Sequence, residues 1–243
     1  MPDNPYTTYK DSKTTGYINN VEEMLGVIPH GSNLLTFGCP DASILVPIAK
    51  KKKVTFDVVD FRTDINLEPN EYVKHICCGW EHFKPEKQYD GVILNGIWSW
   101  ISDKDRKSIS RICAKLPKGA MVAVNFDNSV FAMCPDWVRD LWIRLYPSYK
   151  DIHLTNEAFI ELARRHNLDK LPVPIMVDLL NRHTETWRDY IIQPHYRAFS
   201  VMEVFEHFTK LGMTLEHPSA NTEEQVIEAL LTKGYPHNYY RKN

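Results

Sequence analysis

The stretch 33–125 alternates short apolar runs with helical patterns, and this alternation constrains the fold more than any other feature of the sequence. The apolar runs at 33–37, 54–59, 91–95 and 120–125 each have the length of a buried strand. Strands that alternate with helices indicate βαβ units and therefore a parallel sheet. Such a sheet binds ligands beyond the carboxyl ends of its strands. The pattern therefore predicts the position of a binding site before it indicates the ligand.

The elements around these strands follow from the spacing of apolar residues. Helices are expected at 17–27, 41–52, 103–116, 199–211 and 221–233. Two further strands are expected at 70–78 and 213–216, and the tail at 239–241 is expected to close an edge of the sheet. Pro47 is expected to kink the helix that contains it.

Residues 129–197 interrupt the alternating pattern with a helical, aromatic-rich stretch that is too long for a plain connection. We interpret this stretch as a helical cap inserted over the mouth of the sheet. The expected domains are an N-terminal arm and helix, a binding core, the cap, and a C-terminal part that completes the core, at 1–32, 33–128, 129–197 and 198–243. The predicted class is α/β, with a Rossmann-like, doubly wound, mostly parallel seven-stranded sheet and a helical cap insertion.

Composition excludes several classes of protein. The chain has 243 residues and a formal net charge of −2, which argues against a general nucleic-acid binder. Its first fifteen residues are polar and no apolar run has the length of a membrane span, so we expect a cytoplasmic protein with no membrane partner. The five cysteines include no CxxC pair, so no metal site is expected.

Several segments resemble motifs of class I S-adenosylmethionine-dependent methyltransferases. The resemblance covers about 21–216, and the order and spacing of the motifs carry it, at 34–42, 89–101, 116–122, 194–200 and 211–213. It implies S-adenosylmethionine as the cofactor and a small molecule as the methyl acceptor. An oligomer is possible.

Physical reasoning supports a nucleotide-like cofactor at the first two strands. Gly38 follows the first strand, where a glycine lets the backbone turn tightly and approach a ligand closely. An acid about 20 residues later accepts hydrogen bonds from ribose hydroxyls in nucleotide-binding folds. Asp57 and Asp60 lie 19 and 22 residues beyond Gly38. We favour Asp60, because the strand 54–59 delivers it at the edge, and we keep Asp57 as the alternative.

The resemblance implies further cofactor contacts. Pro40 stands where the family has its second glycine, which removes one backbone N–H from the loop. After the third strand, Trp80 is placed to stack on adenine and Glu81 to supply an acid for the adenine amine. The loop after the fourth strand is expected to line the cofactor through Asn95, Ile97 and Trp98.

Methylation of an oxygen atom requires a base that titrates near neutral pH, and histidine has this property. His195 is our first choice because it lies where the chain returns from the cap to the core, and His183 is the second. Acceptor contacts are expected from Trp100, Arg182, Tyr196 and Arg197.

These expectations favour a methyltransferase that acts on a small polar acceptor, with O-methylation of a sugar or other metabolite as the reaction. The fourth strand lacks the Asn-Pro-Pro-Tyr-like tetrad of enzymes that methylate amino groups of DNA bases or glutamine. A catalytically inactive binding or regulatory protein of the same fold is the alternative, motivated by Pro40 and Trp80. Another reaction that uses S-adenosylmethionine on this fold is the second alternative.

Overall fold

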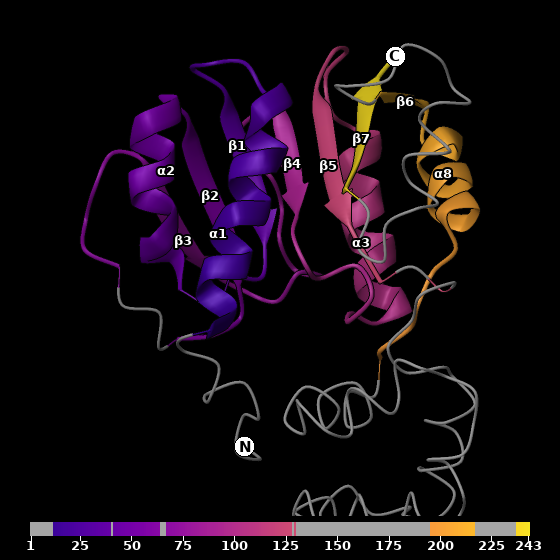
Figure 1. The fold of residues 1–243 in the computed structure, drawn as a ribbon, viewed down its shortest axis with the longest axis horizontal. Coiled ribbons are helices and arrows are strands. Elements are labelled where there is room, and N and C mark those ends of the chain that lie inside the picture. The colour runs from indigo at the N-terminus through magenta and orange to yellow at the C-terminus, as the bar shows by residue number, and fades with distance from the viewer. Residues whose placement is uncertain (1–11, 40, 64–66, 128, 130–194, 217–236) are drawn as a thin grey trace, which may run out of the picture.

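The computed structural model describes residues 12–39, 41–63, 67–127, 129, 195–216 and 237–243. Within these residues seven strands form one sheet in the order β3-β2-β1-β4-β5-β7-β6 (Figure 1). The strands are β1 (Asn33–Phe37), β2 (Thr55–Asp60), β3 (Val73–Cys77), β4 (Gly91–Leu94), β5 (Met121–Asn125), β6 (Met213–Glu216) and β7 (His237–Lys242). The predicted mostly parallel, seven-stranded Rossmann-like sheet is confirmed.

The strands β1 to β5 pair in parallel, and β7 runs antiparallel to both β5 and β6. The strand order reverses between β1 and β4, which are neighbours in the sheet. The carboxyl ends of all five parallel strands meet at one edge, the lower edge in Figure 1. This edge at the reversal point is where doubly wound sheets bind ligands.

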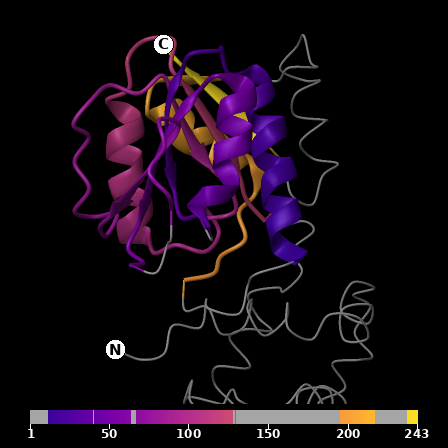
Figure 2. The ribbon, with the colours of Figure 1, turned by 90° about the vertical axis from the view of Figure 1, so that its left-hand side faces the viewer.

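Helices cover both faces of the sheet, which gives three layers (Figure 2). One face packs against α1 (Ser12–Met24) and α2 (Leu45–Lys52), with short 3₁₀ turns at Leu25–Val27 and Ala42–Ile44. The other face packs against α3 (Asp103–Ala114) and α8 (Val201–Lys210).

Local capping interactions fix where the helices begin. The Ser102 hydroxyl accepts a hydrogen bond from the amide of Asp105 at the start of α3. Ser200 and Glu203 form a reciprocal capping box at the start of α8. Pro47 is the third residue of α2, in the first turn, where the backbone N–H has no intrahelical acceptor. The sequence placed Pro47 inside a helix spanning 41–52, whereas α2 begins at Leu45.

The C-terminal tail occupies a different place from the one that the sequence suggested. β7 inserts between β5 and β6, so β6 and β3 are the two edge strands of the described sheet. Tyr239 and Tyr240 are buried, with relative exposures of 1% and 0%. The prediction that 239–241 closes an edge was wrong, because β7 pairs with a strand on each side.

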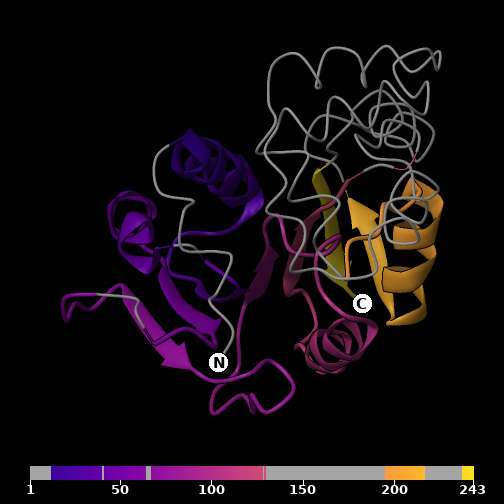
Figure 3. The ribbon, with the colours of Figure 1, turned by 90° about the horizontal axis from the view of Figure 1, so that it is seen from below.

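The connection from β3 to β4 contains no helix over 78–90, whereas α2 connects β1 to β2 and α3 connects β4 to β5. This loop lies on the same face of the sheet as α3 (Figure 3). The expected helix at 221–233 and the cap at 130–194 lie outside the described residues. None of the described helices is long and apolar enough to cross a membrane.

Candidate functional site

The turn after β1 is built around Gly38, whose φ is +65°. Its amide donates a hydrogen bond to the Val59 carbonyl at 3.0 Å, which ties the turn to the end of β2. A Cβ atom on Gly38 would lie 3.0 Å from Cγ2 of Ile97 and 3.2 Å from Cζ2 of Trp80. Both the backbone conformation and the space around it therefore require glycine.

Asp60 is the last residue of β2 and lies next to this turn, with 4% of its surface exposed. Its Oδ2 accepts a hydrogen bond from the amide of Cys39 at 3.2 Å. Its Oδ1 accepts from the backbone amide of Arg62 at 3.0 Å and from Nε of the same residue at 3.2 Å. The carboxylate thus holds the Gly38 turn, and the ionised group is compensated by donors and by a cation.

Asp57 lies in the middle of β2, and its side chain faces another part of the molecule. Its Oδ2 accepts a hydrogen bond from the Tyr89 hydroxyl at 2.7 Å and pairs with Nζ of Lys87 at 3.1 Å. Burial raises the pKa of Tyr89, and the neighbouring Asp57 raises it further. Of the two candidate acids, Asp60 lies beside the Gly38 turn, whereas the side chain of Asp57 contacts the loop before β4.

Trp80 lies against the Gly38 turn. Its Nε1 donates a hydrogen bond to the Val59 carbonyl at 3.0 Å, and its ring packs edge to face on Phe37 and Phe61. Glu81, in contrast, forms ion pairs with Lys104 and, at 3.0 Å, with His82. The hydrogen bond from Lys104 lowers the pKa of Glu81. Trp80 thus reaches the turn, while the carboxylate of Glu81 is held toward the start of α3.

Asn95 connects the ends of two strands to α1. Its side chain is 2% exposed, donates to the Tyr17 carbonyl at 3.1 Å and accepts from Nδ2 of Asn125 at 2.7 Å. Oδ1 of Asn125 in turn accepts from the amide of Gly96. The Asn95 amide is therefore engaged on both sides, and this network fixes the position of the loop after β4.

Ile97 and Trp98 follow Asn95 and point to different surroundings. Ile97 contacts the Gly38 turn, as the 3.0 Å approach of its Cγ2 shows. Trp98 is 2% exposed and packs in the core against Phe199 and Phe208. The structure therefore brings Ile97, but not the Trp98 ring, to the turn after β1.

The chain returns to the core at 195–199 along the same carboxyl edge. The amide of Arg197 donates to the Ser99 carbonyl at 2.8 Å, so the segment lies beside the loop after β4. The rings of Trp100 and Tyr196 are in contact, with centroids 4.9 Å apart. His195 is exposed and immediately precedes Tyr196 in the chain. The Arg197 guanidinium forms a salt bridge with Glu203.

Pro40, Arg182 and His183 lie outside the described residues. In the part of the chain that the structure describes, no three His, Cys, Asp or Glu side chains are grouped so that they could hold a metal ion.

Comparison with solved structures identifies the fold. PKMT2 from Rickettsia typhi superposes with a TM-score of 0.55 and 13% identity over 93% of this chain, which spans 52% of PKMT2. The mycolic acid cyclopropane synthase CmaA1, with SAH and CTAB bound, gives a TM-score of 0.52 and 15% identity over 88% of this chain and 69% of CmaA1. The plantazolicin methyltransferase BpumL, in complex with SAH, gives 0.53 and 13% over 95% of this chain and 84% of BpumL. No protein-family model and no curated protein sequence matches the chain.

This chain has the class I methyltransferase fold. The resemblance inferred from the motifs at 34–42 and 89–101 is confirmed at the level of the fold, while the identities of 13–15% carry no statement about substrate.

The methyltransferase fold also brings Tyr17 and Cys39 to the carboxyl edge, and sequence reasoning did not select either of them. Burial raises the pKa of Tyr17 well above its ordinary value, and the neighbouring Cys39 raises it further. Burial likewise raises the pKa of Cys39 to about 12. Both shifts favour the protonated forms of these two groups. The helical pattern predicted a helix at Tyr17, but nothing in the sequence indicated that the helix crosses this edge.

Proposed function

We propose that this chain is an S-adenosylmethionine-dependent methyltransferase that acts on a small polar acceptor, with O-methylation of a sugar or other metabolite as the reaction. The observation that carries the proposal is the Asp60 carboxylate, which accepts a hydrogen bond from the Cys39 amide in the Gly38 turn, beside the reversal point of a methyltransferase-type sheet. The structures of CmaA1 and BpumL, which share this fold, contain SAH. Their shared ligand supports S-adenosylmethionine as the cofactor here.

The residues at this edge fit such a cofactor. Gly38 presents backbone without a side chain, and the donors from Cys39 and Arg62 occupy part of the acceptor capacity of Asp60. A carboxylate has about four acceptor positions, so Asp60 retains room for a ribose hydroxyl. Ile97 and Trp80 supply the apolar walls beside the turn. Because the Asn95 side chain is engaged, the loop 95–97 would contact the cofactor through its backbone and Ile97.

The cofactor supplies an electrophilic methyl group when bound. The chain would align the acceptor with that group and exclude water, which lowers the barrier by several kcal/mol in reactions of this kind. His195 would take the proton from the acceptor hydroxyl, and its exposed position beside Trp100 and Tyr196 suits a group that meets a substrate. Acceptor contacts remain proposed for Trp100, Arg182, Tyr196 and Arg197. His183 remains the second candidate for the base.

Two alternatives each have a specific observation in their favour. The Trp80 ring packs against the Gly38 turn, where it would compete with an adenine for space, and this favours an inactive binding protein. The similarity to CmaA1, a cyclopropane synthase by name, favours another reaction that uses S-adenosylmethionine.

Calorimetric titration with S-adenosylhomocysteine tests the cofactor site. Asp60→Ala should weaken binding by at least about 10-fold, since a hydrogen bond to a charged group contributes about 1.5–3 kcal/mol. Asp57→Ala is the matched control, because it removes an equally buried carboxylate of the same strand and should leave the affinity unchanged. Circular dichroism must first show that both variants are folded. No binding by the wild type would favour the inactive protein.

Product analysis then separates the two reactive hypotheses. Mass spectrometry of incubations with candidate acceptors should show a net gain of one CH2 unit, because a methyl group replaces the hydroxyl proton. Since cyclopropanation gives the same gain, fragmentation must also place the new methyl group on an oxygen atom of the acceptor. His195→Ala should lower turnover by about 100-fold while cofactor affinity stays intact. His30→Ala, an exposed histidine before β1 at the opposite edge, serves as the control. Full turnover in His195→Ala would exclude His195 as the base.

A further inference from the structure

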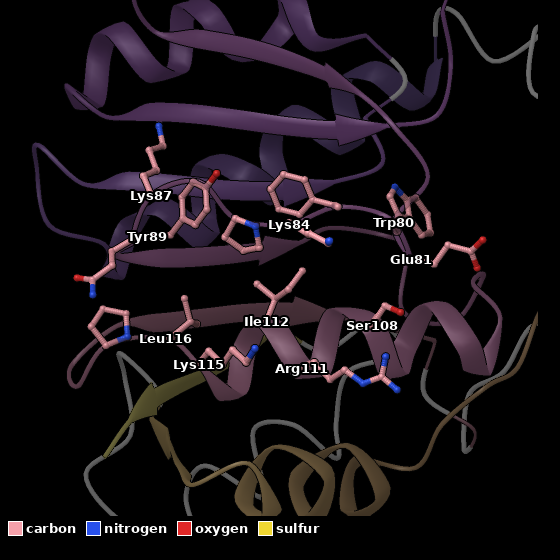
Figure 4. A pocket seen from close by; sticks show the side chains of 14 residues that line it. Trp80, Glu81, Lys84, Lys87, Tyr89, Ser108, Arg111, Ile112, Lys115 and Leu116 are labelled. Atoms are coloured by element: carbon pink, nitrogen blue, oxygen red, sulfur yellow. The ribbon is translucent and has the colours of Figure 1, made fainter.

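The helix-free connection between β3 and β4 leaves a groove on one face of the sheet. The loop 78–90 and α3 line an open groove with a volume of about 560 Å³ between them (Figure 4). Cavities of about 300–1,000 Å³ are typical of sites for small molecules. The groove begins at Trp80 near the carboxyl edge and extends along α3 to Pro117, just before β5.

The walls of the groove are apolar and are held in place. Ile112 and Leu116 contribute buried aliphatic side chains from the α3 side. Phe83 packs edge to face on Phe37 with ring centroids 5.9 Å apart. Trp80 is fixed by its hydrogen bond to the Val59 carbonyl, and Tyr89 by its bond to Asp57. The aromatic surfaces are thus fixed before any ligand binds, which lowers the entropic cost of binding.

Three cations surround this apolar interior. Lys84 comes from the loop, and Arg111 and Lys115 come from α3 and the residue that follows it (Figure 4). Arg111 lies in the last turn of α3 and Lys115 is the C-cap residue of the same helix, and both line the groove. All three are exposed, and none forms a salt bridge with a described residue.

The other charged residues of the lining are already neutralised within the chain. Lys87 pairs with Asp57 at 3.1 Å. Glu81, the one acidic residue among those that line the groove, pairs with Lys104. The groove therefore keeps an uncompensated positive charge from three side chains above an apolar and aromatic interior.

We propose that this groove binds a small molecule with a planar apolar body and at least one anionic group, such as an aromatic carboxylate, sulfonate or phosphate ester. The body would lie against Phe83, Ile112 and Leu116, and the anion would meet Arg111 and Lys115. The site is separate from the proposed cofactor edge, because it lies along α3 on the face of the sheet, with Trp80 between the two. The inference does not depend on the methyltransferase proposal.

Two matched dyes test the inference in the full-length protein. The first is 1-anilinonaphthalene-8-sulfonate, and the second is N-phenyl-1-naphthylamine, which has the same rings without the sulfonate. The wild type should bind the sulfonate at one site with an affinity that decreases as NaCl is added. The double substitution Arg111→Gln with Lys115→Gln should weaken sulfonate binding by about 10-fold, because it removes both exposed cations that would pair with the sulfonate. Binding of the neutral dye should change by less than about 2-fold.

The control variant is Lys107→Gln, which removes an exposed cation of α3 that does not line the groove. It should bind both dyes as the wild type does. A second control adds excess S-adenosylhomocysteine, which should leave the sulfonate bound. The proposal is overturned if the wild type binds no sulfonate, if the double variant binds it unchanged, if Lys107→Gln weakens it equally, or if S-adenosylhomocysteine displaces it.

Discussion

Replacement of Gly38 by alanine tests whether the turn after β1 is as tightly packed as the structure shows. The new methyl group would lie 3.0 Å from Cγ2 of Ile97 and 3.2 Å from Cζ2 of Trp80, both on buried or half-buried side chains. The residue would also have to keep a φ of +65°. We therefore expect two separate costs, one from the backbone and one from packing.

The two costs can be estimated from the geometry. A non-glycine residue in the left-handed region costs about 1–2 kcal/mol, and overpacking of a well-filled interior costs about 1–3 kcal/mol. Gly38→Ala should therefore lower the free energy of unfolding by about 2–5 kcal/mol. For a chain of this size that corresponds to a decrease in Tm of about 4–20 °C.

Gly31→Ala provides a control that isolates the backbone cost. Gly31 has a φ of +83°, and a Cβ there would meet no atom within 4 Å. This variant should lose only about 1–2 kcal/mol. Differential scanning calorimetry of both variants gives the packing cost as their difference, and adding Trp80→Phe to Gly38→Ala should reduce it. If the two glycine variants lose the same stability, the proposed close packing of Ile97 and Trp80 on Gly38 is refuted.

Two further predictions concern groups outside the proposed cofactor site. Tyr89→Phe removes the donor to the buried Asp57 carboxylate and should lower the free energy of unfolding by about 1–3 kcal/mol in urea titrations; an unchanged midpoint would show that Asp57 does not depend on this bond. Burial, together with the nearby Lys210 and Arg106, lowers the pKa of His207 in the folded protein. Unfolding then takes up a proton, so stability is retained above about pH 6.5 and decreases as the pH falls below it. His207→Gln should flatten this decrease in Tm measured between about pH 5 and 7, and an unaltered slope would assign it to other groups.

Local rules were sufficient to predict the order of the elements and the position of the glycine turn. The apolar runs at 33–37 and 91–95 became buried strands, because four or five consecutive apolar residues can be buried on both faces of a parallel sheet. Gly38 was identified because a strand that ends abruptly before a helix needs a turn residue with unrestricted φ. Spacing also limited the candidate ribose-binding acids to Asp57 and Asp60, and the end of the predicted strand favoured Asp60.

The sequence did not show which neighbours the side chains of the candidate residues meet in the folded protein. Asp57 and Asp60 are an odd number of residues apart on one strand, so they point to opposite faces of the sheet. Which of them meets the Gly38 turn depends on how β2 pairs with β1, where Phe37 lies opposite Val59. The Trp98 ring was expected at the cofactor, but α3 and α8 together provide an apolar space in which it is buried.

The sequence by itself determined the strand-helix order, the turn at Gly38 and the two candidate acids, because these depend on interactions between residues close together in the chain. The sequence favoured Asp60 from its place at the end of a strand, and the structure adds the contact of Asp60 with the turn. Tertiary structure alone decided that Tyr17 reaches the same edge and that β7 inserts between β5 and β6. Each of these contacts joins segments that are far apart in the sequence. These contacts form because the assembled sheet buries the side chains and satisfies their hydrogen bonds. A short stretch of sequence does not predict them.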